Sequence, residues 1–325
     1  MHRRNFAIIA AAAAVSAPLT ALAAGPKDLN GRWDLTVPGN DRKRAWWLEI
    51  KGADTASPSG SFVGASGGDC DPIRDIKVNP DGSATFAVRR EIRNPKDGVK
   101  EWVGTYKVRA AGSSKIEGTA AYPKQAPQTF SGVRAPKFEQ ADGSKMKAGA
   151  PVELFNGRDV SGWHALRTNT PFLWKVEQGV LKNGPGTTDI VSDAKFMDFK
   201  LHVEYRVGPG SNSGIGLRGR YEVQILEDLG KPANTHGNGA LYSRILPTEN
   251  ASKPANEWQT VDITLAGNIV TVVLNGKKVI DAKEIDGLTA IAMDPDEGEP
   301  GPLVLQGDHG PVEFRKITVT PLSRK

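Results

Sequence analysis

Hydrophobic and polar residues alternate with a period of two along most of this chain, a pattern typical of half-buried β-strands. Within residues 28–135 the pattern recurs in short segments, at residues 31–37, 46–50, 61–64, 84–88, 102–108 and 116–120. Turn sequences separate these segments, as in Asn79-Pro80-Asp81-Gly82. Short strands at this spacing, with no helical period, predict an antiparallel barrel or sandwich.

The opening of this first domain, Gly31-Arg32-Trp33 followed by hairpins, resembles a lipocalin-type small barrel. Such a barrel either binds a small ligand or packs on its neighbour as an accessory module. This half of the chain carries no clustered histidines or carboxylates, so we expect the accessory role.

Residues 136–150 are polar, contain Pro, Gly and Lys, and show no periodicity, which predicts a linker. In residues 151–325 the alternation returns, at residues 172–176, 179–181, 199–207, 257–265, 269–274, 302–306 and 312–319. Asn275-Gly276 is the preferred dipeptide of a tight hairpin. So many strands in one domain predict two stacked sheets, a jelly-roll β-sandwich.

One stretch of the second domain, residues 210–226 (GSNSGIGLRGRYEVQIL), differs from the others in where its polar residues lie. Its glycines and Asn-Ser pair predict a bend that leads into a strand. Alternation along that strand would place Arg218, Glu222 and Gln224 on one face. A cation, a carboxylate and an amide on one face suit the floor of a polar cleft. The alternative is an edge strand whose polar face is simply wet.

The composition limits the class of protein and the kinds of partner that we expect. Hydrophobic residues make up 38% and charged residues 24% of the 325 residues, an ordinary globular balance, and the length favours two domains. The net charge of +5 comes from charges of both signs mixed along the chain, with no basic stripe interleaved with aromatics, so nucleic acid is not an expected partner. The lone cysteine, Cys70, excludes an intramolecular disulfide.

The N-terminus has the pattern of an export signal. Arg3 and Arg4 precede a short apolar run at residues 6–17, and Ala21-Leu22-Ala23 fits a cleavage site. The paired arginines resemble a twin-arginine signal, and a plain secretory signal is the alternative. We therefore expect signal residues 1–24 to be removed and the mature protein to be periplasmic or secreted, with no membrane association.

Ordered motifs run through the second domain, beginning with Leu154-Phe155-Asn156-Gly157 and Ser161-Gly162-Trp163. Further motifs follow at residues 198–201, 212–218, 221–226, 239–242, 257–259, 274–276, 301–306 and 314–317. Together they resemble the 3-keto-disaccharide hydrolase family, formerly a domain of unknown function, over about residues 152–322. The chain departs from the family pattern at Gln259 and Lys316, where the family usually has Asn. The resemblance implies a concanavalin-like jelly roll.

The resemblance also implies a hydrolase or lyase that cleaves glycosides already oxidised to a ketone at C3 of the sugar. The ketone acidifies the C2 proton, a base removes it, the C1 substituent leaves by β-elimination, and water adds to the enone. Such a reaction needs a carboxylate or histidine as base and an electrophile at the enolate oxygen.

On this reading Glu222 is the base or a metal ligand, Arg218 clamps the enolate or the substrate, and His309 completes the catalytic set. The residues expected to contact the sugar are Asn212, Gln224, Tyr242, Gln306 and His236. Each of these residues could instead have a purely structural role: a glutamine could be hydrogen-bonded to the backbone, and a histidine could be a solvent-exposed loop residue.

Metal use stays open at this point. Glu222, His309 and Asp308 could ligate a divalent ion, although their spacing is no recognised metal motif. The acidic loop Asp294-Pro295-Asp296-Glu297-Gly298-Glu299 could hold calcium through oxygen ligands or could be a solvated loop. No cofactor is therefore certain, and a divalent metal ion such as calcium is possible.

Two other functional classes remain. A noncatalytic carbohydrate-binding module is the main alternative, because jelly rolls host lectins as readily as enzymes. An ordinary glycosidase with paired carboxylates is weaker, because Glu204, Glu222 and Glu227 do not obviously converge.

Overall fold

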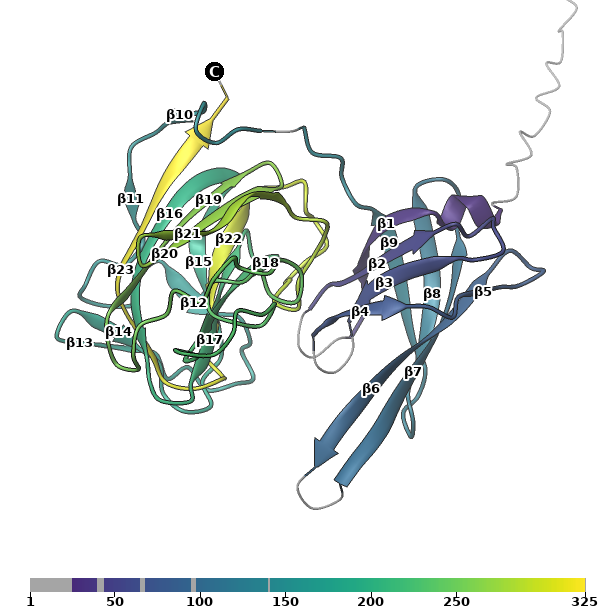
Figure 1. The fold of residues 1–325 in the computed structure, drawn as a ribbon, viewed down its shortest axis with the longest axis horizontal. Coiled ribbons are helices and arrows are strands. Elements are labelled where there is room, and N and C mark those ends of the chain that lie inside the picture. The colour runs from purple at the N-terminus through teal and green to yellow at the C-terminus, as the bar shows by residue number, and fades with distance from the viewer. Residues whose placement is uncertain (1–24, 40–43, 65–67, 95–97, 140, 325) are drawn as a thin grey trace, which may run out of the picture.

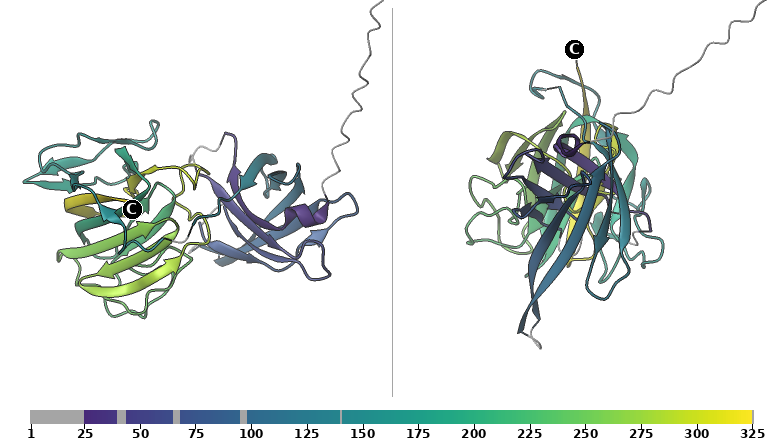
Figure 2. Two further views of the ribbon diagram at one scale, coloured as in Figure 1. Left: turned by 90° about the horizontal axis from the view of Figure 1, so that it is seen from above. Right: turned by 90° about the vertical axis from the view of Figure 1, so that its right-hand side faces the viewer.

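The computed structural model describes residues 25–39, 44–64, 68–94, 98–139 and 141–324. The predicted export signal at residues 1–24 lies outside the described residues. Across the described ranges the chain is built from strands, with one 3₁₀ turn, η1 (Pro26–Leu29), and no α-helix. No helix in these ranges has the length and apolar character needed to cross a bilayer. Two β-bodies lie side by side (Figures 1 and 2).

The first body is one curled antiparallel sheet with the strand order β4-β3-β2-β1-β9-β8-β7-β6-β5. Its strands are β1 (Gly31–Thr36), β2 (Trp46–Lys51), β3 (Ser59–Val63), β4 (Cys70–Ile73), β5 (Lys77–Val78), β6 (Ala84–Asn94), β7 (Gly98–Ala110), β8 (Lys115–Ala121) and β9 (Gln128–Arg134). Inward-facing aromatics, among them Trp46, Phe62 and Tyr106, fill its interior. Arg90 on β6 donates to Asp71 on β4 (Nε–Oδ2 3.0 Å), which joins the two ends of the curl.

The second body is a sandwich of two antiparallel sheets. The large sheet has the order β13-β14-β23-β16-β19-β20-β21, and β10 and β11 also pair with β23. Its strands are β10 (Lys147–Ala148), β11 (Val152–Glu153), β13 (Lys175–Glu177), β14 (Val180–Lys182), β16 (Asp198–Val207), β19 (Gln259–Ala266), β20 (Ile269–Leu274), β21 (Lys277–Glu284) and β23 (Val312–Ser323).

The small sheet of the sandwich has the order β12-β15-β22-β17-β18. Its strands are β12 (Trp163–Ala165), β15 (Ile190–Phe196), β22 (Gly301–Leu305), β17 (Asn212–Leu217) and β18 (Tyr221–Leu226). Apolar residues from the facing sides of both sheets form one core, as strand alternation requires. The predicted all-β fold, a barrel followed by a jelly roll, is thus confirmed. Lys147–Ala148, inside the predicted linker, pairs with the end of β23.

The barrel packs directly on the sandwich. Trp47 on β2 is fully buried in the same apolar cluster as the sandwich core, and the Arg244 guanidinium lies 4.3 Å above its ring. The backbone of Ala45 donates to the carbonyl of Ala292 at 2.8 Å. Gly287 leaves the space that the Trp47 indole occupies, since a β-carbon there would overlap the ring.

Candidate functional site

The outward face of the small sheet carries a buried carboxylate. Glu222 on β18 is opposite Gly216 on β17, and its side chain lies over the neighbouring Gly214. A β-carbon at Gly214 would overlap the Glu222 carboxylate. Glycine is therefore required at position 214, because it makes room for this carboxylate against the sheet.

Three amide side chains surround Gly214 on the same face. Gln224 is opposite Gly214 in the β17–β18 pair, and the backbone of Gln306 donates to the Gly214 carbonyl at 3.0 Å from the other side. Asn212 lies two residues before Gly214 along β17. The side-chain oxygens of Asn212, Gln224 and Gln306 are buried, and no donor among the described residues reaches them. Since buried polar atoms are normally satisfied, these oxygens are suited to accept hydrogen bonds from a hydroxyl-rich ligand.

The environment of Glu222 suits a base at neutral pH. Its side chain is 3% exposed, and no hydrogen bond from another described residue ends on its carboxylate. Burial raises the pKa of Glu222 to about 7, Arg44 and His309 oppose that rise, and the Asp189 and Asp308 carboxylates add to it. A carboxyl group with this pKa is about half ionised at neutral pH, and its ionised form is basic enough to take a proton from carbon.

His309 lies in the turn after β22 and forms a pair with Asp308. Its Nδ1 contacts Asp308 Oδ1, and Asp308 Oδ2 accepts from Arg167 Nη2 at 3.0 Å. The hydrogen bond with Asp308 raises the pKa of His309 above its usual value, and burial opposes this. Burial also disfavours the Asp308 carboxylate, but its bonds to His309 and Arg167 outweigh that effect and hold its pKa at about 2. The charges therefore favour an imidazolium beside Glu222.

Asn183 stabilises the turn that carries His309 through three hydrogen bonds. Its Nδ2 donates to the carbonyls of Gly307 and Gly310, at 2.8 and 2.7 Å, and its Oδ1 accepts from the backbone of Val312 at 2.8 Å. The Gly307 amide donates to Asp189 Oδ1 at 3.0 Å. These bonds fix the backbone of the turn that carries His309 relative to the sheet.

Tyr242 and His236 lie together in the loop after β18, which runs back beside that strand. Their rings meet edge to face with centroids 4.8 Å apart, and the Tyr242 amide donates to the Glu222 carbonyl. His236 Nε2 contacts Asp69 Oδ1 at 2.8 Å, and Asp69 belongs to the barrel. Burial raises the pKa of Tyr242, and the carboxylates of Asp69 and Glu222 add to it.

Arg218 is a correction to the sequence analysis. It lies in the turn between β17 and β18, in the left-handed region (φ 52°), and is not part of the strand that carries Glu222. Its guanidinium is fully buried between Phe138 and Tyr221 and donates to the carbonyl of Gly267. The prediction that it shares a sheet face with Glu222 is wrong, because the tight turn at 218–220 interrupts the alternation.

Three charged residues in the site escaped sequence reasoning: Arg44, Arg167 and Asp189. Asp189 is fully buried just before β15, and its Oδ2 accepts from Arg44 Nη2 at 2.8 Å. A buried Asp next to a strand could have been noticed from the apolar residues that follow it, whereas nothing local marks Arg44.

The other carboxylates considered from sequence lie elsewhere. Glu204 is on the outward face of the large sheet with Arg315, and Glu227 accepts from the backbone of Gly210 at 3.2 Å. In the acidic loop, Asp294 pairs with Arg220 at 2.6 Å and Glu297 is buried. Among the described residues no group of three or more His, Cys, Asp or Glu is arranged to hold a metal ion.

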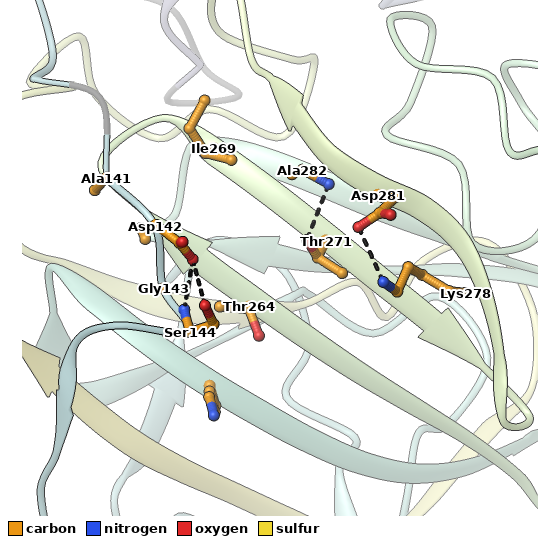
Figure 3. A pocket seen from close by; sticks show the side chains of 12 residues that line it. Ala141, Asp142, Gly143, Ser144, Thr264, Ile269, Thr271, Lys278, Asp281 and Ala282 are labelled. Carbon is orange, nitrogen blue, oxygen red and sulfur yellow. Dashed lines mark hydrogen bonds and ion pairs between the residues drawn. The ribbon is translucent and has the colours of Figure 1, made fainter.

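A groove of about 600 Å³ lies between residues 141–144 and strands of the large sheet, β19–β21 (Figure 3). Several of its polar groups are paired: Lys278 with Asp281 at 3.2 Å, and Thr271 with the backbone of Ala282 at 3.0 Å. None of the described residues that line it has a buried side-chain polar atom without a partner, so we assign the candidate site to the small sheet.

The sandwich domain is similar to known proteins. A curated protein of Bacteroides thetaiotaomicron, 3-keto-disaccharide hydrolase, is 25% identical over 167 residues, covering 40% of this chain and 57% of that protein. The match thus spans little more than half of that relative. Two crystal structures of proposed glycosyl hydrolases of Parabacteroides distasonis have TM-scores of 0.46, with 26% and 21% identity. They cover 55% and 53% of this chain and 91% and 94% of theirs.

The family model of the 3-keto-alpha-glucoside-1,2-lyase-like domain matches residues 150–320, which is more than half of the chain. The match coincides with the sandwich and includes Glu222, His309 and the three amides around Gly214. The resemblance seen in the sequence is confirmed: this chain belongs to the 3-keto-alpha-glucoside-1,2-lyase-like domain family.

Proposed function

We propose that this protein is an exported enzyme that cleaves 3-keto-glycosides, with Glu222 as the base that removes the C2 proton. The observation that carries the proposal is the placement of Glu222, buried over Gly214 and surrounded by amide oxygens without partners. A sugar supplies the hydroxyl donors that those oxygens lack. Family membership and the name of the Bacteroides relative support a 3-keto substrate.

The first step is proton transfer from C2 to the Glu222 carboxylate. The C3 ketone makes this proton acidic by delocalising the resulting negative charge onto its oxygen. The electron pair of the C2–H bond then forms a C1–C2 double bond as the C1–O bond to the aglycone breaks. Water adds across that double bond, with hydroxyl at C1 and hydrogen at C2, which releases a free 3-keto sugar.

We assign to His309 the protonation of the departing oxygen. The Asp308 contact favours its charged form, and its charge and that of Glu222 act on each other. A base and an acid in one site can move the two protons of an elimination. Asp308 and Arg167 would orient the imidazole through the contacts described above.

Export is part of the proposal and rests on the pattern of residues 1–24, whether the signal is of the twin-arginine or the secretory kind. The division into a barrel at 28–135, a linker at 136–150 and a catalytic sandwich at 151–325 is likewise proposed as the functional organisation.

The test compares purified protein on 3-keto-trehalose and on trehalose. We expect 3-ketoglucose and glucose from the first and no products from the second. Cleavage of trehalose itself would point to an ordinary glycosidase instead. Binding of either sugar, measured by calorimetry, with no product from 3-keto-trehalose or other 3-keto-glucosides would favour the carbohydrate-binding module.

A further inference from the structure

The barrel places a cation at the Glu222 site. Arg44 lies two residues before the start of β2, and its Nη2 donates to Asp189 Oδ2 at 2.8 Å while its Nη1 donates to the carbonyl of Ile291. Asp189 has no exposed side-chain surface, and its other oxygen holds Gly307 of the His309 turn at 3.0 Å. Arg44 is thereby connected through one buried carboxylate to the turn that carries the proposed acid.

The pairing of strands in the small sheet shows where Asp189 lies relative to the amide side chains around Gly214. Ile190 pairs with Leu305, and Leu305 pairs with Ile215, so Asp189, Gln306 and Gly214 follow one another across three adjacent strands. Gln224 continues this row opposite Gly214. Residues of one such row point to the same face of a sheet. Arg44 therefore binds at the end of the row over which the Glu222 carboxylate lies.

The charge of Arg44 acts on Glu222. After burial, which raises the pKa of Glu222, Arg44 has the largest effect on that carboxylate, and it lowers the pKa. Of the positive groups that act on Glu222, Arg44 comes from the barrel and His309 from the sandwich. The electrostatics thus agree with the hydrogen bonds in connecting a barrel residue to the site.

A second barrel loop reaches the other side of the site. Asp69 contacts Nε2 of His236, whose ring packs on Tyr242, and the amide of Cys70 donates to Ser243 Oγ at 2.9 Å. Arg90 of the barrel donates to Asp71 and so supports this loop from behind. Residues of the barrel therefore lie on both sides of Glu222.

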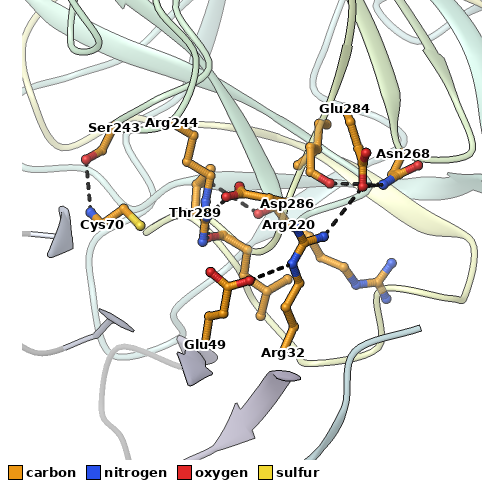
Figure 4. A network of polar contacts seen from close by, with 12 residues as sticks. Arg32, Glu49, Cys70, Arg220, Ser243, Arg244, Asn268, Glu284, Asp286 and Thr289 are labelled. Atoms are coloured by element: carbon orange, nitrogen blue, oxygen red, sulfur yellow. Dashed lines mark hydrogen bonds and ion pairs between the residues drawn. The ribbon is translucent and has the colours of Figure 1, made fainter. Parts of the chain in front are cut away.

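Further contacts join the barrel to the sandwich (Figure 4). Arg32 bridges Glu49 of the barrel at 3.2 Å and Glu284 of the sandwich at 3.5 Å. Trp47 is buried beneath Arg244. Arg44 is a further contact between the two bodies, and it differs from these because Asp189, the carboxylate that it binds, also holds the turn that carries His309.

We propose that the barrel is part of the catalytic unit, with Arg44 as a positioning residue that fixes Asp189 and provides positive charge at the Glu222 site. The family-matched sandwich alone would then lack this cation. The inference rests on the proposed function for the identity of the reaction, but the effect of Arg44 on Glu222 is a property of the protein without substrate. Arg218, expected from sequence to provide the cation, is enclosed elsewhere.

The test uses the full chain with Arg44→Ala, Arg44→Gln and Arg44→Lys, and Arg32→Ala as matched control. Arg32 lies at the same interface and forms ion pairs there, but it is not among the charges that act on Glu222. Two quantities are measured: the acid limb of kcat/KM on 3-keto-trehalose, and the titration of the Glu222 carboxyl by carbon NMR, assigned with Glu222→Gln.

For Arg44→Ala and Arg44→Gln we expect both the acid limb and the Glu222 titration to move up by about one pH unit, because an opposite charge has been removed. Arg44→Lys should restore much of the wild-type position, and Arg32→Ala should leave it unchanged. If Arg44→Ala fails to fold, Arg44→Gln and Arg44→Lys decide the question.

The inference is overturned if the Glu222 titration in the neutral Arg44 variants stays at its wild-type position, or if Arg32→Ala moves it equally. Failure of the proposed function has a different signature: wild-type protein would then show no turnover of 3-keto-trehalose, while the NMR titration would still report whether Arg44 acts on Glu222.

Discussion

The outward faces of the two sandwich sheets differ in whether their polar side chains have partners. On the large sheet several charges have a counterpart: His202 Nδ1 contacts Asp262 Oδ1 at 2.7 Å, Glu204 pairs with Arg315, and Glu313 pairs with Arg206. On the small sheet the oxygens of Asn212, Gln224 and Gln306 have no partner among the described residues. Paired charges on a wet surface need no ligand to explain them, whereas partnerless buried amides do. This contrast supports our assignment of the candidate site to the small sheet.

The largest effect should come from changing one glutamate on each face. We expect Glu222→Gln to lower kcat by about 10²–10⁴-fold, the range for loss of a general base. Glu204→Gln, on the large sheet, should stay close to wild type. Comparable losses for both variants would contradict the contrast between the faces. Kinetics on 3-keto-trehalose measure both.

The same variants separate activity from stability. The folded protein holds the Glu222 proton more tightly than the unfolded chain, so between the unfolded pKa near 4.5 and the folded pKa of about 7 its contribution to stability falls as pH rises. Glu222→Gln removes this loss of stability at high pH, because glutamine does not ionise. Its melting temperature at pH 8 should equal or exceed that of wild type, which would show that the lost activity is not a folding defect.

A smaller but still large effect is expected at Gly214. Gly214→Ala places a methyl group where the Glu222 carboxylate lies, and displacement of a reacting group by about 1 Å costs roughly 10²-fold in rate. Gly149→Ala is the matched control, since a β-carbon there meets only ordinary contacts, with the Pro321 carbonyl at 3.4 Å. Full activity of Gly214→Ala would remove Glu222 from the centre of the site.

The pH profile sharpens the assignment of acid and base. Below about pH 7 kcat/KM should fall tenfold per unit as Glu222 becomes protonated, since its pKa is about 7. On the alkaline side it should fall as His309, whose pKa is raised, loses its proton. His309→Gln should be slower and should lose the alkaline limb while keeping the acid limb. An unchanged alkaline limb would assign it to another group.

The smallest effects should distinguish a partnerless glutamine from a paired one. Gln306→Ala is expected to raise KM by about two- to tenfold, as for loss of one hydrogen bond to substrate, with little change in melting temperature. Gln259 is different, because its Oε1 accepts from Asn275, Asn238 and the Lys253 backbone. Gln259→Ala should lower the melting temperature and leave KM near wild type. The reverse pattern would contradict the comparison.

Much of the fold was predictable because it depends on local alternation. The segment at 199–207 alternates without interruption and forms β16, and Asn275-Gly276 forms the hairpin between β20 and β21. The same logic failed at Arg218, where three residues of tight turn break the period, so a side chain expected beside Glu222 lies enclosed near Gly267. Alternation predicts a face only as long as the strand continues.

Residue types at short spacing were enough to predict the all-β class, the family of the second domain and the placement of Glu222 and Gln224 along one strand, with Gln306 near the end of another. Tertiary structure alone decided that Gly214 makes room for the carboxylate and that Asp189, Gln306 and Gln224 form one row. It also decided that Arg44 of the barrel binds there. These relations depend on strand register and on how two bodies pack, and such contacts between distant parts of the chain leave no periodic signal along it.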